Sequence, residues 1–171
     1  MKNFGLGVLV ALVFSAGVTY SAQKSDDQVM REMRDRAEIE DLMWRYTRAL
    51  DTNDAAAYAA AYTADGQFSA GANATKGREA LTKMIADLRA GNAAQEAKGV
   101  RRPPMYHMTA NHAVTFLGKD SARVDAYYIT AVAAAGQDTP LRVAAVGRSV
   151  DELVRQNGRW LIKSRNVAPA N

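Results

Sequence analysis

Residues 37–54 read AEIEDLMWRYTRALDTND, and the spacing of their apolar side chains is helical. Apolar residues recur at intervals of three and four from residue 33 to residue 50, with acids and arginines between them, which predicts an amphipathic helix over 25–50. The DTND motif at 51–54 ends this helix, and Asp54 is a suitable N-cap for a second, alanine-rich helix over 55–62. The domain is therefore expected to open with two helices joined by a tight turn.

The next segment predicts a turn at 63–66, a short strand at 67–70 and a loop at 71–77. A third helix is expected over 78–90, because Leu81, Met84, Ile85 and Leu88 form an apolar stripe at helical spacing. We expect Gly91 to end it.

After residue 104 the pattern changes to strand-length runs rich in Val, Tyr, Thr and Ile, at 105–116, 121–135, 141–156 and 159–167. Asn157-Gly158 is the strongest hairpin signal in the chain. Helices followed by hairpin-connected strands predict an α+β domain, an antiparallel sheet with its helices packed on one face.

The chain has 171 residues and no cysteine, which suits one globular domain and excludes disulfides, thiolate metal sites and cysteine nucleophiles. Its formal charge is +4, but the basic residues are spread along the whole sequence. Nucleic-acid binding needs a basic patch, so no nucleic-acid partner is predicted.

Residues 1–22, MKNFGLGVLVALVFSAGVTYSA, have the layout of a secretory signal peptide: a lysine, an apolar run and a small-residue end. The apolar run at 4–18 is shorter than the roughly 20 residues of a spanning helix, so no permanent membrane anchor is predicted. Cleavage is expected after Ser21 or Ala22. The mature domain, 23–171, would then work in the periplasm or outside the cell.

The stretches 37–54, 62–66 (YTADG), 76–81 (KGREAL) and 150–165 (VDELVRQNGRWLIKSR) together resemble the nuclear transport factor 2-like superfamily and, within it, the SnoaL-like group. The resemblance runs from about residue 36 to residue 167. It implies a cone-shaped α+β fold, in which a strongly curved antiparallel sheet and N-terminal helices enclose an apolar pocket. It also implies a homodimer or homotrimer.

Within this superfamily the chain resembles the branch of scytalone dehydratase and hexachlorocyclohexane dehydrochlorinase. There, an aspartate that ends the first helix pairs with a histidine base on the first long strand, and the matching residues here are Asp51 and His107. Arg165 matches an arginine that lines the pocket. Tyr46 stands where the dehydrochlorinase has a lysine that holds chloride, which favours loss of an oxygen leaving group over loss of halide.

The chemistry implied is proton abstraction by His107, with Asp51 fixing the tautomer of the ring and stabilising the imidazolium that forms. Arg165 and Tyr46 would stabilise developing charge or the leaving group. The remaining predicted pocket residues are Trp44, Tyr58, Asn111 and Tyr127. No cofactor is needed for this reaction.

Each of these residues also has a plain structural interpretation. Asp51 can simply end a helix, Arg165 can pair with an acid, and Tyr46, Trp44 and Tyr58 can belong to the core. Strict alternation puts His107 on one face of its strand with Thr109 and Asn111. The same alternation puts His112 on the opposite, apolar face with Val114 and Phe116, as a hydrogen-bonded packing residue. Two histidines without a tight ligand cluster predict no metal site.

The sequence thus predicts an exported, cofactor-independent lyase that acts on a small apolar cyclic or aromatic substrate by a dehydratase-like elimination. Two alternatives remain open, because a fold of this kind does not fix function. One is an isomerase or hydrolase that uses the same pocket. The other is a non-catalytic module that binds a small ligand or assembles with itself.

Overall fold

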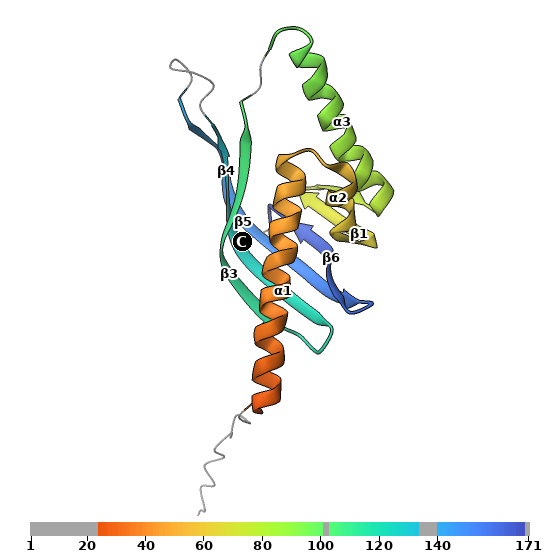
Figure 1. Ribbon diagram of the computed structural model, residues 1–171, viewed down its shortest axis with the longest axis vertical. Helices are drawn as coiled ribbons and strands as arrows, with labels where there is room; N and C mark the ends of the chain where they lie inside the picture. The colour runs from red at the N-terminus through yellow and green to blue at the C-terminus, as the bar shows by residue number, and fades with distance from the viewer. Residues whose placement is uncertain (1–23, 101–102, 134–139, 170–171) are drawn as a thin grey trace, which may run out of the picture.

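The computed structural model describes residues 24–100, 103–133 and 140–169, so the predicted signal peptide lies outside the described residues. Its elements are α1 (Asp26–Asp51), α2 (Ala55–Ala60), β1 (Tyr62–Ala70), β2 (Asn73–Lys76), α3 (Arg78–Glu96), β3 (Met105–Phe116), β4 (Ser121–Val132), β5 (Arg142–Gln156) and β6 (Arg159–Asn166) (Figure 1). The three predicted helices and the four long strands are confirmed.

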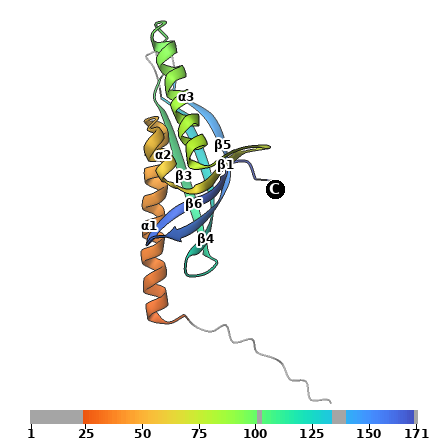
Figure 2. The same ribbon diagram turned by 90° about the vertical axis from the view of Figure 1, so that its right-hand side faces the viewer.

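The strands form one six-stranded sheet in the order β2-β1-β6-β5-β4-β3. Neighbouring strands are antiparallel except β1 and β6, which run parallel. The sheet is curved and unclosed, and the helices lie against one side of it (Figure 2). This arrangement confirms the α+β class, with one parallel pair added to the predicted antiparallel sheet.

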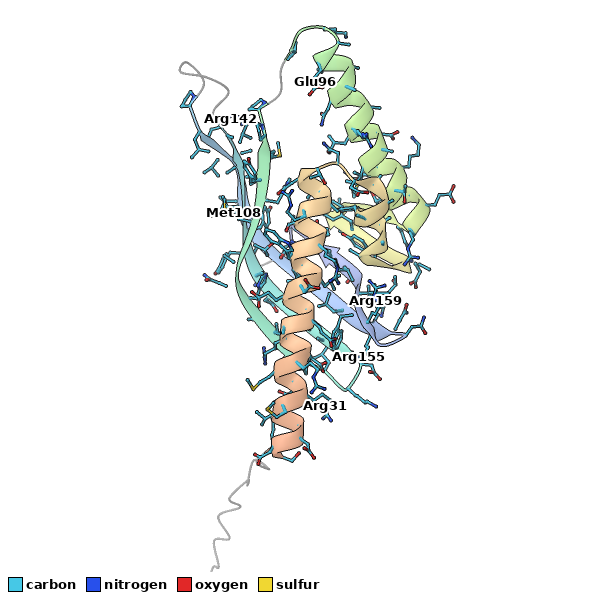
Figure 3. The ribbon with its side chains drawn as sticks, viewed as in Figure 1. Arg31, Glu96, Met108, Arg142, Arg155 and Arg159 are labelled. Carbon is cyan, nitrogen blue, oxygen red and sulfur yellow. The ribbon has the colours of Figure 1, made fainter. Side chains whose placement is uncertain are left out.

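Helix α1 begins at a Ser25 N-cap, whose hydroxyl accepts a hydrogen bond from the Gln28 backbone N–H at 3.2 Å. Acidic residues in its first turn and Arg48 in its last turn both complement the helix dipole. Arg155 of β5, labelled in Figure 3, pairs with Asp35 and Glu38 and ties the helix to the sheet. This pairing explains why an aspartate is buried on the sheet-facing side of α1.

The core fills the space between the helices and the sheet. Tyr46, Tyr58 and Tyr62 form an aromatic cluster in it, with ring centroids 5.2 to 6.1 Å apart. Aliphatic side chains from α1, α3 and the strands complete it: Ile39, Leu42, Leu81, Ile85, Val124, Leu153 and Ile162.

Three boundary predictions between the helices and the long strands are wrong. Residues 63–66 are not a turn and 71–77 are not a plain loop, because β1 begins at Tyr62 and β2 pairs with its end. Long-range pairing with β6 gives 62–70 a strand partner that local sequence does not reveal. The second helix accordingly stops at Ala60.

Helix α3 does not end at Gly91 but continues to Glu96. Gly91 is exposed, and an interior glycine costs a helix only about 1 kcal/mol relative to alanine. The residue that turns the chain is Gly99, which has φ 80° and which the left-handed region suits.

Strand β3 contains a β-bulge that strict alternation does not predict. Ala110 pairs with Tyr127 and Ala113 pairs with Asp125, so β3 carries one extra residue at this point. Asn111 lies there with φ 54°. The bulge exchanges the two faces, so Val114 and Phe116 share the helix-facing side with His107, and the prediction that they lie opposite His107 is wrong.

Candidate active site

His107 lies between two hollows on the helix side of the sheet. A groove of about 530 Å³ runs between α1 and β3, and its lining includes Glu40, Trp44 and Thr47 of the helix. A second hollow of about 440 Å³ lies where the ends of α1 and α3 approach the start of β3. His107 borders both hollows and is the residue that they share.

The last residue of α1, Asp51, holds His107 in place. Its Oδ1 lies 2.8 Å from the Nδ1 of the imidazole and also accepts the His107 backbone N–H at 3.0 Å. The Asp51 side chain is 9% exposed and that of His107 is 27% exposed. The predicted Asp51–His107 pair is therefore present, with the carboxylate shielded and the ring open to solvent.

This geometry determines which nitrogen of the ring is available for chemistry. An ionised carboxylate only accepts hydrogen bonds, so Nδ1 carries the proton and donates it to Asp51. The lone pair of the neutral ring is then on Nε2, which is the nitrogen that can accept a proton from a ligand. A histidine oriented by a buried carboxylate is the arrangement of a general base.

Arg165 and Tyr46, the other two predicted catalytic residues, lie in the interior. Both are 3% exposed, and the Arg165 guanidinium lies 4.7 Å above the centre of the Tyr46 ring. Arg165 forms an ion pair with Asp151 of β5, which is fully buried. In this conformation neither residue reaches a ligand in the groove, so their predicted contact with substrate is not seen.

The electrostatics of this interior cluster follow from burial. Burial raises the pKa of Asp151 to about 6, and the Arg165 guanidinium opposes that rise. Burial also holds the pKa of Tyr58 and Tyr62 above the ordinary range, so both are neutral phenols. The cluster thus places one buried guanidinium behind the groove, with one carboxylate to compensate it.

Asp151 and Ser149 are interior polar residues that were not predicted from the sequence. The Ser149 Oγ, Asp151 Oδ1 and Arg165 Nε atoms have no hydrogen-bond partner among the described residues. The signal was the alternation S-x-D-x-L at 149–153, in which two polar residues share a strand face with a buried leucine.

The four predicted pocket residues lie in four different places. Trp44, 64% exposed, lines the groove. Tyr58 lies in the aromatic core, and Tyr127, 57% exposed, lies on the outer face of β4 opposite the buried Val124 and Ala126; both predictions of pocket contact are wrong. Asn111 forms the bulge and shapes the strand through its backbone.

The predicted enclosed apolar pocket is not seen around Tyr46. That space is filled by the protein's own side chains, whereas the groove and the second hollow are open and partly polar. Within the described ranges, no group of three His, Cys, Asp or Glu side chains is placed to hold a metal ion. In the same part of the chain, no helix has the length and apolar character needed to cross a membrane.

Solved structures share this fold at low sequence identity. A protein of unknown function from Mycobacterium tuberculosis is 23% identical, with 84% of this chain and 76% of that chain covered and a TM-score of 0.69. An NTF2-like protein with a cystatin-like fold from Novosphingobium aromaticivorans is 21% identical, with 88% and 93% covered and a TM-score of 0.68. A protein from the same species, provisionally named a scytalone dehydratase, is 22% identical, with 81% and 85% covered and a TM-score of 0.63.

These likenesses show the nuclear transport factor 2-like fold and nothing finer. No curated protein matches the chain significantly. A family model for the SnoaL-like domain, however, matches residues 31–166, which include every helix and strand around the groove except the first turn of α1. The chain therefore belongs to the SnoaL-like domain family.

Proposed function

We propose that the protein is a lyase that removes a proton from a small cyclic or aromatic substrate and eliminates an oxygen leaving group, with no cofactor. The observation that carries this proposal is the 2.8 Å contact between Asp51 Oδ1 and His107 Nδ1 beside an open groove. The groove volume of about 530 Å³ lies within the range of small-molecule sites.

In the proposed reaction, His107 Nε2 takes a proton from a substrate carbon. The electron pair of that C–H bond forms a new C=C bond, and the C–O bond on the neighbouring carbon breaks. The departing oxygen leaves as water after it receives a proton from the imidazolium or from solvent. Asp51 stabilises the imidazolium while it exists, because the carboxylate lies directly on its Nδ1–H.

Arg165 and Tyr46 take no direct part in this proposed reaction. Their burial keeps them out of contact with a ligand in the groove, so we assign them no bond to the leaving group. A solved relative in fold, provisionally named a scytalone dehydratase, supports an elimination as the reaction type.

The experiment is a turnover screen with one- and two-ring β-hydroxy ketones, followed by mass spectrometry. We expect a product lighter by one water from the wild type, and a rate lower by about 10²- to 10⁴-fold in His107→Gln. Lys83→Gln, on the exposed surface of α3, is the matched control and should keep the full rate. Turnover that survives in His107→Gln would remove the proposed base.

The two rival functions give different products in the same screen. An isomerase returns a product of unchanged mass, and a hydrolase adds one water. A binding module shows saturable binding without any product. Each of these results would replace the lyase proposal.

We also propose that residues 1–22 direct export, as their sequence pattern predicts. The test is the N-terminal sequence of the protein recovered from a periplasmic extract or the culture medium. A start at Ala22 or Gln23 would support export, and an intact Met1 in the cytoplasmic fraction alone would overturn it.

We propose, finally, that two copies associate through the outer face of the sheet. Met108, Ile129 and Val146 lie side by side across β3, β4 and β5, and they are 48%, 38% and 70% exposed. A continuous apolar row of this kind marks an interface, and a second copy related by a two-fold axis would meet it with the same row.

Light scattering coupled to size exclusion tests this association. Val146→Glu should convert the oligomer to a monomer, whereas Leu117→Glu, equally exposed but outside the row, should not. A monomeric wild type would rule out the proposed interface.

A further inference from the structure

The bulge in β3 determines where His112 lies. Between the pairs Ala110–Tyr127 and Ala113–Asp125 the strand has one residue more than its neighbour, so alternation restarts after Asn111. His112 then has the same phase as Val114 and Phe116, which pack towards the core. The second histidine is thereby turned towards α1, on the same side as His107, and is not the packing residue on the opposite face that the sequence predicts.

Both histidines border one groove. His107, Thr109 and His112 line its β3 side, and α1 closes the other side with Glu40 and Trp44. A ligand that fills this groove therefore lies against two imidazoles that come from the same strand but from opposite sides of the bulge.

The charges around His112 come from two other elements. Partial desolvation beside the groove lowers the pKa of His112, which is otherwise exposed. Arg165 of β6 acts in the same direction, and Glu40 of α1 opposes them. Glu40 lines the groove beside the ring, Arg165 acts on it from the interior, and His107 shares the groove on its own strand. At neutral pH the ring is uncharged, and one of its nitrogens carries a proton that can be donated.

We propose that His112 is a substrate-binding residue of this site, and that its neutral ring donates a hydrogen bond to a hydroxyl or carbonyl oxygen of the substrate. This proposal rests on the proposed function for the position of the base, and it adds a requirement on the substrate. The substrate carries an oxygen acceptor on the part that lies towards the bulge, while the carbon that loses its proton lies at His107. A purely hydrocarbon ligand would leave this donor unpaired in the groove.

The test compares two ligands of similar shape, 1-tetralone, which carries a carbonyl oxygen, and tetralin, which carries none. Binding to the mature wild-type protein is followed by NMR of the histidine side chains. We expect 1-tetralone to shift the His112 resonances. Its affinity should fall about five- to tenfold in His112→Phe and return in His112→Gln, whose amide can donate again. Tetralin should bind all three proteins equally.

The outcomes separate this proposal from the proposed function. Equal loss of both ligands in His112→Phe would show a role in shape alone and would overturn the proposal. Binding of 1-tetralone that leaves the His112 signals unmoved, or no binding at all, would overturn it too. If the turnover screen contradicts the lyase proposal, the result for His112 is unaffected, because ligand binding is measured without turnover.

Asn111→Gly provides the matched control within the bulge. Glycine accepts φ 54° as readily as asparagine does, so the bulge and the position of His112 are kept while the Asn111 side chain is removed. We expect the selectivity for 1-tetralone to be unchanged in this variant. If it disappears, the oxygen is bound by the Asn111 amide and not by His112.

Discussion

A single oxygen of Asp51, its Oδ1, accepts hydrogen bonds from both the backbone N–H and the ring Nδ1 of His107, at 3.0 and 2.8 Å. The last residue of α1 therefore fixes the path of β3 and the orientation of the base at the same time. A substitution at Asp51 acts on the fold and on the chemistry, and the two effects have to be measured separately.

Asp51→Asn and Asp51→Ala separate them. The asparagine Oδ1 can still accept both hydrogen bonds, so Asp51→Asn should keep the fold and the Nδ1–H tautomer but lose the charge that stabilises the imidazolium. We expect turnover to fall by about 10²-fold. Asp51→Ala leaves the part-buried His107 N–H without its acceptor and should cost a further 1–3 kcal/mol or so of stability.

Nitrogen-15 chemical shifts of the His107 ring report the tautomer, and urea unfolding reports the stability. The His112 ring serves as the internal control, because in the described part of the chain Asp51 pairs with His107 and makes no hydrogen bond or ion pair with His112. Full activity in Asp51→Asn would mean that the carboxylate charge plays no part in the reaction.

Breaking the Asp151–Arg165 ion pair should strengthen the pH dependence of stability that the raised pKa of Asp151 already causes. Arg165→Met removes the charge that opposes the effect of burial, so the pKa of Asp151 rises further above about 6. A folded-state pKa above the unfolded value of 3.8 means that the stability contribution is present at low pH and is lost as pH rises through the folded value. We expect the free energy of unfolding of Arg165→Met to fall as pH rises from about 4 to above about 6, and to fall further than in the wild type.

Breaking a buried pair of this kind typically costs about 3–5 kcal/mol at neutral pH. Asp151→Asn added to Arg165→Met removes the uncompensated carboxylate. The double variant should recover part of that loss and should lose the part of the pH dependence that Asp151 causes. Chemical unfolding at a series of pH values measures both effects. A flat pH profile in Arg165→Met alone would show that Asp151 is not buried as an acid.

The elements that were predicted correctly are those that depend on residues close together in the sequence. The stripe of α1, the Asp54 cap and the Asn157-Gly158 turn depend on residues within one or two turns of each other. The strand predicted at 67–70 is the second half of β1. The first half of β1 and all of β2 were not predicted, because β1 is held by β6, about a hundred residues away in sequence.

The Asp51–His107 pair could be predicted only because the family resemblance shows which residue of the first helix lies beside which residue of the first long strand. Asp51 and His107 are 56 residues apart, and no spacing rule brings them together. The bulge at Asn111 and the irregularity between Glu152 and Leu153 shift the register by one residue each. Because of the first shift, alternation predicted the wrong face of the sheet for His112. Because of the second, Asp151 pairs with Arg165, whereas a regular hairpin with its turn at 157–158 would pair Asp151 with Ser164.

The β5–β6 hairpin should be sensitive to its turn. Asn157 and Gly158 both have positive φ, 51° and 75°, as a type I′ turn requires. Gly158→Ala forces a β-carbon into the left-handed region and should cost about 1 kcal/mol, although nothing lies within 4 Å of the added atom. Gly91→Ala is a control with the opposite expected sign. Gly91 lies at an exposed position inside α3, so alanine should stabilise the protein by a similar amount. Thermal unfolding of the two variants checks both signs.

The backbone of Asn111 should matter more than its side chain. At φ 54° glycine and asparagine are tolerated, whereas a β-branched residue is strained by about 1–2 kcal/mol. Asn111→Gly should therefore change stability by a few tenths of a kcal/mol, and Asn111→Val should lose about 1–2 kcal/mol. In Asn111→Val the strain also favours a regular strand, which would turn His112 to the outer face. Nuclear Overhauser contacts between His112 and α1 should weaken in Asn111→Val and persist in Asn111→Gly. Equal contacts in both variants would show that the rest of the sheet, and not Asn111, maintains the bulge.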